Sequence, residues 1–178
     1  YDYKKSFKNL RNLIKEVNST NFKTLLDFGG GELTNFYTLI KNIKRRNSKT
    51  FFSCDISFLR LFHGVEFLKR KNISLNKVNF FVNDNYKIPL PDSSIDIVTT
   101  CHVIEPNKKM AINIIKELFR ITKKKLILLE PDNKLSKKRD YLSQKKIDKR
   151  FQKHNYVKNI DLKLKKLKIK FDKIYLTN

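Results

Sequence analysis

The stretch Leu25-Leu26-Asp27-Phe28-Gly29-Gly30-Gly31-Glu32 joins a short apolar run directly to a glycine turn. Glycine has no Cβ, so such a turn lets backbone N–H groups approach a ligand closely. If the apolar run is a strand, Asp27 lies near its carboxyl end, where open α/β sheets bind their ligands. A carboxylate there repels a pyrophosphate and suits a cationic or amino-bearing ligand. A dinucleotide fingerprint would also need glycine at Thr34, so the stretch predicts a strand–turn–helix unit with another kind of ligand.

Segments with helical spacing of apolar residues alternate along the chain with short apolar runs. The expected helices cover residues 6–17, 32–44, 57–71 and 109–121, and the expected strands cover residues 23–28, 50–55, 77–82, 95–100 and 125–130. Alternation of this kind implies parallel strands joined by crossover helices. We therefore expect an α/β fold, with a doubly wound, mainly parallel, Rossmann-like sheet flanked by helices.

The length of 178 residues suits a single domain with one proper core. We divide it into an N-terminal helix region (1–22), a ligand-binding core (23–130) and a basic C-terminal region (131–178). Within the last region, residues 135–151 predict a basic helix or a mobile insert. Residues 160–167 predict a short helix, and residues 171–176 predict a final strand.

The formal net charge of +23 raises the question of a polyanionic partner. Lysines are spread along the whole chain, and Asn and Ile are also abundant, so compositional bias explains the charge better than a dedicated nucleic-acid footprint. The one real basic concentration lies at residues 137–139, 145–146 and 149–150.

Two further features bear on the compartment. No apolar run approaches the ~20 residues that a membrane span needs, so we expect none. The two cysteines, Cys54 and Cys101, are too few for a disulfide framework or a metal site. We interpret both as small buried hydrophobic residues in a reducing cytosol, which favours a cytoplasmic protein without a bound metal.

The glycine motif, Asp55, Asp84 and the segment His102-Val103-Ile104-Glu105 occur in an order and spacing that resemble class I S-adenosylmethionine-dependent methyltransferases. The resemblance covers residues 23–130 and is strongest to the type 11 group. It implies S-adenosylmethionine as the cofactor and S-adenosylhomocysteine as the product. It also implies a seventh, antiparallel strand, for which this sequence offers no candidate.

The resemblance assigns roles residue by residue. Asp55 would accept hydrogen bonds from the ribose hydroxyls and Ile56 would pack against adenine. Asp84 with Asn85 would meet the adenine amino edge. The full set of expected cofactor-binding residues is Asp27, Phe28, Gly29, Gly30, Gly31, Asp55, Ile56, Asp84, Asn85, Thr100 and Cys101.

Three positions keep more than one interpretation. Leu33 stands where the family often has a third glycine, which tightens the turn-to-helix packing. His102, unlike His63 and His154, falls near the expected site. It is either a general base for the acceptor or a wall residue held by a backbone partner. Glu105 either caps the next helix or orients His102.

Three functions follow from these observations. The first is methyl transfer to a small-molecule acceptor, such as a sugar or another metabolite, by in-line displacement at the sulfonium methyl. The second is methylation of tRNA or rRNA, which the positive charge favours, although the Asn/Asp-Pro-Pro-aromatic motif of amino-group methylases is absent. The third is a non-catalytic binding or assembly role for the same fold.

Overall fold

The computed structural model describes residues 2–84, 87–131 and 141–172. Its helices are α1 (Tyr3–Asn18), α2 (Thr34–Lys41), η1 (Arg46–Ser48), α3 (Phe58–Arg70), α4 (Ala111–Ile121), α5 (Tyr141–Lys153) and α6 (Ile160–Lys166). Its strands are β1 (Thr24–Phe28), β2 (Thr50–Asp55), β3 (Val78–Val82), β4 (Ile95–Cys101) and β5 (Thr122–Leu129). These bounds confirm the expected alternation of strand and helix.

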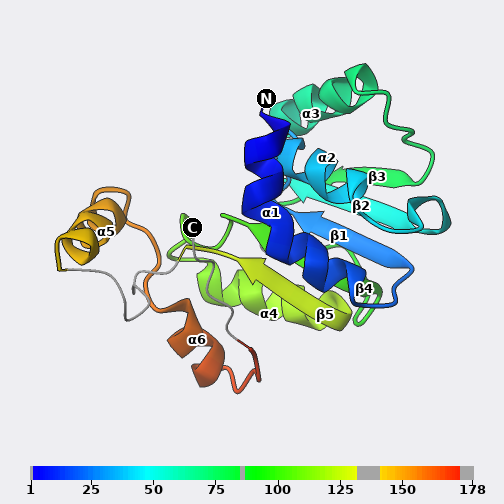
Figure 1. Cartoon of the computed structure of the whole chain (residues 1–178). Helices are drawn as coiled ribbons and strands as arrows, with labels where there is room; N and C mark the ends of the chain where they lie inside the picture. The colour runs from blue at the N-terminus through cyan, green and yellow to red at the C-terminus, as the bar shows by residue number, and fades with distance from the viewer. Residues whose placement is uncertain (1, 85–86, 132–140, 173–178) are drawn as a thin grey trace.

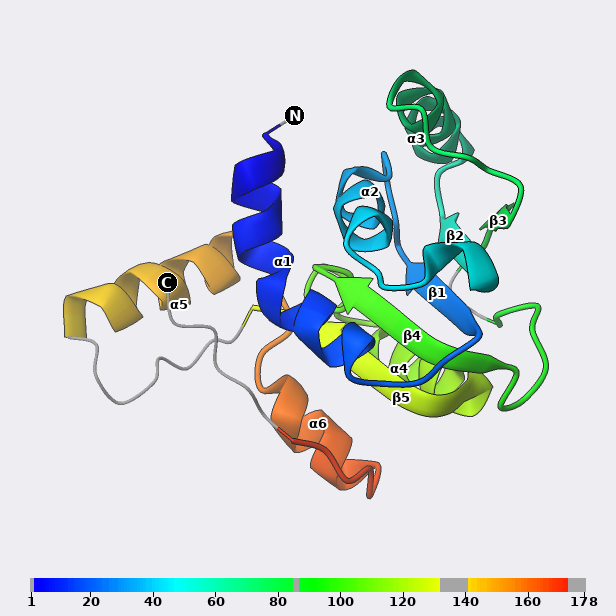
Figure 2. The ribbon, with the colours of Figure 1, turned by 45° about the vertical axis from the view of Figure 1, so that its right-hand side comes forward.

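The described strands form one sheet in the order β3-β2-β1-β4-β5, and every neighbouring pair is parallel. The strand order reverses between β1 and β4, which is the place where doubly wound sheets form their ligand crevice. Figures 1 and 2 show α1 and α4 on opposite sides of this sheet. The predicted fold class is therefore confirmed.

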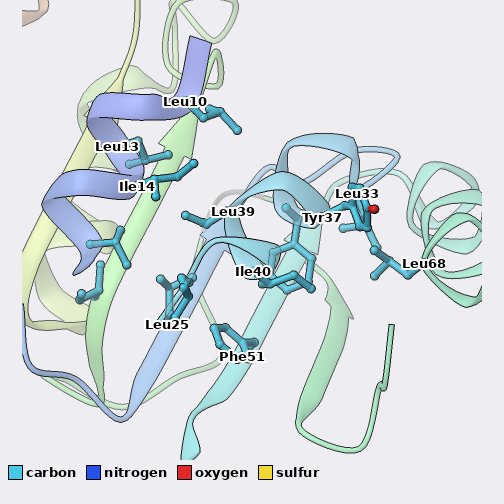
Figure 3. Close-up of a cluster of buried hydrophobic side chains, with 14 of the residues drawn as sticks. Leu10, Leu13, Ile14, Leu25, Leu33, Tyr37, Leu39, Ile40, Phe51 and Leu68 are labelled. Atoms are coloured by element: carbon cyan, nitrogen blue, oxygen red, sulfur yellow. The ribbon is translucent and has the colours of Figure 1, made fainter. Parts of the chain in front are cut away.

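Each face of the sheet has its own hydrophobic core. Leu25 of β1 belongs to the core under α1, α2 and α3, part of which is drawn in Figure 3. The next residue, Leu26, belongs to the core under α4 and α6. Successive side chains of a strand point to opposite faces, so a central strand covered on both sides reads as a continuous apolar run.

The first strand is held in register at its amino end by Asp96. The Oδ2 atom of Asp96 accepts hydrogen bonds from Lys23 N (2.6 Å) and Thr24 N (3.4 Å). The backbone N–H of Asp96 in turn donates to Thr24 Oγ1 at 2.9 Å. This two-way contact explains why an aspartate stands between Ile95 and Ile97 near the start of β4.

Helix boundaries differ from expectation where the backbone leaves the right-handed region. The helix expected at 32–44 is shorter, because Leu33 at its N-cap is left-handed (φ 59°) and Asn42 ends it. Ser57 caps α3 as predicted, since its Oγ accepts from Arg60 N at 3.3 Å. At the other end of the chain, β5 begins directly after α4 rather than at residue 125.

The C-terminal region packs against the core through a few apolar residues. Val157, and Leu164 of α6, are buried in the core under α4, and Val157 N donates to Glu105 O at 2.7 Å. Phe151 of α5 is buried beside Tyr156, with ring centroids 5.7 Å apart. The rest of α5 extends away from the sheet in both views (Figures 1 and 2). Of the final strand expected at 171–176, residues 173–178 lie outside the described part of the chain.

Candidate functional site

The glycine turn closes against the end of β2. Gly29 N and Gly30 N both donate to Cys54 O, at 2.8 and 2.9 Å. Gly29 has φ 77° and Gly31 has φ 54°, a left-handed backbone that glycine adopts at no steric cost. A Cβ at Gly29 would overlap the side chain of Val103, so the glycine also permits close contact with the loop after β4.

Leu33 takes the left-handed place of the family's third glycine at an energetic cost of about 1 kcal/mol or more. Its side chain is fully buried, and Figure 3 shows it beside Leu68 between α2 and α3. A Cβ added to Gly64 of α3 would lie 2.5 Å from Leu33 Cγ. The Leu33 side chain therefore fits against α3 because residue 64 is a glycine.

Asp27 is the buried acid of the turn. Its Oδ1 accepts a hydrogen bond from Thr99 Oγ1 at 3.2 Å. Burial raises the pKa of Asp27 to about 7, the Thr99 hydrogen bond opposes that rise, and the charge of Asp55 adds to it. The carboxyl is consequently poised near neutrality, and a cationic group placed against it would favour the ionised form.

Asp55, at the end of β2, is also buried, but its carboxylate accepts two hydrogen bonds from backbone N–H groups. Its Oδ2 accepts from Gly31 N at 2.9 Å and its Oδ1 accepts from Ser57 N at 3.0 Å. The carboxylate thus ties the glycine turn to the start of α3. A carboxylate oxygen accepts more than one hydrogen bond, so both oxygens keep capacity for ligand hydroxyls.

An ion pair that the sequence pattern did not single out lies beside this carboxylate. Arg60 forms a bidentate pair with Glu32, with Nε–Oε1 at 2.8 Å and Nη2–Oε2 at 3.0 Å. The guanidinium lies over Gly31, where an added Cβ would be 2.5 Å from Nη2, and Nη1 is 3.9 Å from Asp55 Oδ2. Glu32 and Arg60 are 28 positions apart, so no local sequence motif marks this pair.

Apolar side chains are exposed around the carboxyl ends of β2 and β3. Ile56 is 62% exposed, and Phe58 and Val82 are exposed as well. Asp84 follows β3 in a loop tied to β2 by the hydrogen bond from Asn83 N to Asp55 O (3.1 Å). Ile56 and Asp84 therefore lie near Asp55, whereas Asn85 lies outside the described residues.

The end of β4 brings Thr100, Cys101 and His102 to the other side of the turn. Thr100 Oγ1 donates to Glu130 Oε1 at 2.7 Å, so its hydroxyl is committed to the neighbouring strand end. Asn35 Nδ2 donates to Cys101 Sγ at 3.4 Å. Burial raises the pKa of the Cys101 thiol to about 12, which excludes a thiolate nucleophile near neutral pH. Cys54 is buried, and both cysteines are free.

His102 lies on the rim of the site in a strained left-handed conformation (φ 61°). Its imidazole is 56% exposed, and Nδ1 is 2.8 Å from Oε1 of the buried Glu105. Glu130 was not predicted as a site residue. Its carboxylate accepts from the backbone N–H groups of Val103, Ile104 and Glu105 and so holds the loop that carries His102.

The described ranges contain no cluster of His, Cys, Asp and Glu suited to a metal ion. They also contain no helix that is long and apolar enough to cross a membrane. An open hollow of about 480 Å³ lined by Arg45, Arg46, Asn47 and Ser48 lies at the opposite end of β2 from Asp55, away from every predicted site residue.

Residues 26–129 match the methyltransferase domain family. The chain belongs to this family. The matched range runs from the glycine turn to the end of β5 and includes both Asp55 and the His102 loop, which confirms the resemblance to class I S-adenosylmethionine-dependent methyltransferases. Comparison with curated protein sequences finds no match.

Solved structures of the same fold support the architecture. A S-adenosylmethionine-dependent methyltransferase from Aquifex aeolicus superposes with a TM-score of 0.59 at 18% identity, over 86% of this chain and 88% of that one. The YcgJ protein of Bacillus subtilis gives 0.54 at 19% identity, over 65% of this chain and 46% of its own. A putative methyltransferase of Haloferax volcanii, solved in complex with the Trm112 methyltransferase activator, gives 0.51 at 19%, over 66% and 48%. The chain thus spans less than half of the last two proteins.

Proposed function

We propose that the chain binds S-adenosylmethionine and transfers its methyl group to a small-molecule acceptor. One observation carries the proposal: Asp55 and the glycine turn are hydrogen-bonded to each other through Gly31 N at the carboxyl ends of β1 and β2. A glycine turn alone is weak evidence. A buried acid on the first strand and a second acid joined to the turn make a constellation that suits an amino-acid-bearing nucleoside.

Each end of such a ligand has a matching group. The buried Asp27 would face the ammonium of the methionine part, and Asp55 would accept from the two ribose hydroxyls. The exposed Ile56 would gain burial against adenine, while Asp84 and Asn85 would meet its amino edge. Phe28, Gly29, Gly30 and Gly31 would line the backbone side, with Thr100 and Cys101 forming the wall at the end of β4.

When bound, the cofactor supplies a methyl group that the acceptor attacks, as the carbon–sulfur bond breaks and its electron pair stays on sulfur. The chain's task is to align the two reactants, exclude water and receive the acceptor's proton. The imidazole of His102 lies on the rim of the site, is 56% exposed, and is placed to receive that proton.

The cofactor claim is tested by calorimetric titration of S-adenosylhomocysteine into the wild type and Asp55→Ala. We expect a dissociation constant in the micromolar range for the wild type and at least about a tenfold loss in the variant, equal to ~1.4 kcal/mol. Asp92→Ala is the matched control, because Asp92 is an exposed aspartate in an ion pair with Arg120. Thermal unfolding of both variants separates lost binding from lost folding. No binding to the wild type would overturn the proposal.

RNA is the second candidate acceptor, and the basic α5 is the observation that favours it. This helix carries Lys145, Lys146, Lys149, Arg150 and Lys153 with Asp148 as its one acid. The Haloferax methyltransferase of similar fold was solved in complex with a methyltransferase activator. A partner protein of that kind would help this chain to select an acceptor. A complex with tRNA whose affinity falls steeply between low and physiological salt, together with methylation of that RNA, would favour this candidate.

A further inference from the structure

Behind His102 lie two glutamates of unequal environment. Glu105 is only 3% exposed, and its Oε1 contacts His102 Nδ1 at 2.8 Å. The other oxygen of Glu105, Oε2, is buried without a hydrogen-bond partner among the residues that the structure describes. Burying a carboxylate with one unpaired oxygen lowers the stability of the fold. Such an arrangement is therefore a candidate for a functional role.

Glu130 makes the arrangement rigid. Its Oε1 accepts from Thr100 Oγ1 (2.7 Å) and Val103 N (3.1 Å), and its Oε2 accepts from Ile104 N (3.1 Å) and Glu105 N (3.4 Å). His102 N also donates to Leu129 O at 3.1 Å. The end of β5 therefore fixes the backbone on both sides of the strained His102, so the imidazole is held by its loop as well as by Glu105.

The pKa values of the two glutamates are shifted in opposite directions. Burial, and then the neighbouring Glu105, raise the pKa of Glu130 well above its usual range. Burial alone would raise the pKa of Glu105, but its contacts with His102 and Glu130 lower it. Glu105 is therefore the more acidic of the two carboxyl groups, and it is the one in contact with His102.

We propose that Glu105 is a positioning residue that holds His102 in the tautomer with Nδ1 protonated and the lone pair of Nε2 facing the acceptor. A carboxylate only accepts hydrogen bonds, so the ring nitrogen beside it must donate. This inference rests on the proposed methyl transfer for its use. As the acceptor's bond to the methyl carbon forms, the acceptor's proton passes to Nε2, and the resulting imidazolium is stabilised by the Glu105 carboxylate at Nδ1.

The test is the imidazole ¹⁵N–¹H NMR spectrum of the free protein, which distinguishes the two tautomers without any acceptor. At about pH 8.5 an ordinary histidine is neutral. We expect the Nδ1–H form of His102 in the wild type. In Glu105→Gln, the new amide NH₂ can donate a hydrogen bond to Nδ1, which a carboxylate cannot do, so the population of the Nε2–H form should rise.

Internal and external controls come from the same chain. His63 and His154 should give unchanged signals in Glu105→Gln, since neither has a hydrogen bond to Glu105 in the structure. Glu66→Gln removes an exposed glutamate that pairs with Lys69 and should leave His102 unchanged. If Glu105→Gln does not fold, the wild-type spectrum alone decides, because a dominant Nε2–H form in the wild type overturns the proposal.

An unchanged tautomer in a folded Glu105→Gln protein also overturns it. The outcome is independent of the cofactor claim, which calorimetry with S-adenosylhomocysteine tests separately. Absence of cofactor binding together with the expected tautomers would refute the methyltransferase function and leave the histidine–glutamate arrangement standing. Cofactor binding without the expected tautomers would refute the positioning role alone.

Discussion

At Asp27, ligand binding and folding favour opposite charge states of one side chain. The ligand site asks for a negative charge, whereas the interior of the sheet disfavours one, and the result is a pKa of about 7. A buried acid with a pKa near 7 is typical of functional sites, because its burial lowers the stability of the fold and is retained where the charge has a role.

Cofactor affinity should depend on pH through this residue. Below about pH 7 Asp27 is protonated in the free protein, so binding of an ammonium group must release its proton. Affinity for S-adenosylhomocysteine should therefore fall by up to about tenfold per pH unit on the acid side. Calorimetry in two buffers of different ionisation enthalpy measures the released proton. Asp27→Asn should bind weakly and without this proton release, and a flat wild-type profile from about pH 5.5 to 8 would contradict the assignment.

The Leu33–Gly64 contact joins α2 to α3 and belongs to the scale of elements. Gly64→Ala should destabilise the protein by about 1–3 kcal/mol, because the new methyl group would overlap Leu33. Leu33→Ala leaves a cavity and should cost about 2–5 kcal/mol. Urea unfolding of the two variants and of the double variant gives the coupling between the sites.

The double variant should lose about 0.5–3 kcal/mol less free energy of unfolding than the sum of the two single losses. The reason is that the alanine at position 64 then occupies space that the Leu33 side chain has left. Strictly additive losses would show that the two residues do not share this space. Leu39→Ala is a useful comparison, because Leu39 is buried in the same core, whereas the atoms nearest to an added Cβ at Gly64 belong to Leu33 and Glu32.

The elements could be predicted from the sequence, while parts of the site could not. Apolar runs and glycine turns act locally, so the strands, their parallel order and the positions of Asp27, Asp55 and His102 follow from the pattern. Glu130 and Arg60 are different. Each acts through residues 25 to 30 positions away, namely the loop after β4 for Glu130 and Glu32 for Arg60, and only the folded chain shows such contacts. The predicted roles of the cofactor residues stay predictions.

At the scale of the whole molecule, two buried aspartates give folding stability opposite dependences on pH. Asp27 has a raised pKa, so its contribution is present below the unfolded value of ~3.9 and is lost as pH rises toward about 7. Burial would raise the pKa of Asp96, but hydrogen bonds from Lys23, Lys124 and Thr24 lower it. Its contribution is present above ~3.9 and is lost as pH falls through its lowered folded pKa.

Thermal unfolding at several pH values should separate the two. Asp27→Asn should gain stability relative to the wild type as pH rises from about 5 to 8, because it removes the cost of a buried charge. Asp96→Asn should lose about 1–3 kcal/mol near neutral pH, and the loss should shrink in acid. Identical pH profiles for the two variants would show that neither aspartate controls the stability in this way.

The central strands contribute side chains to both cores, and this has a consequence for changes in the length of the chain. In β1, Leu25 belongs to one core, Leu26 belongs to the other, and the buried Asp27 accepts a hydrogen bond from Thr99. Asp96 holds the amino end of the strand. One codon inserted or deleted between positions 23 and 27 would exchange the two layers and turn the acid to the wrong side. Insertions and deletions should therefore be selected against in β1, because the number of residues there determines which core each side chain enters.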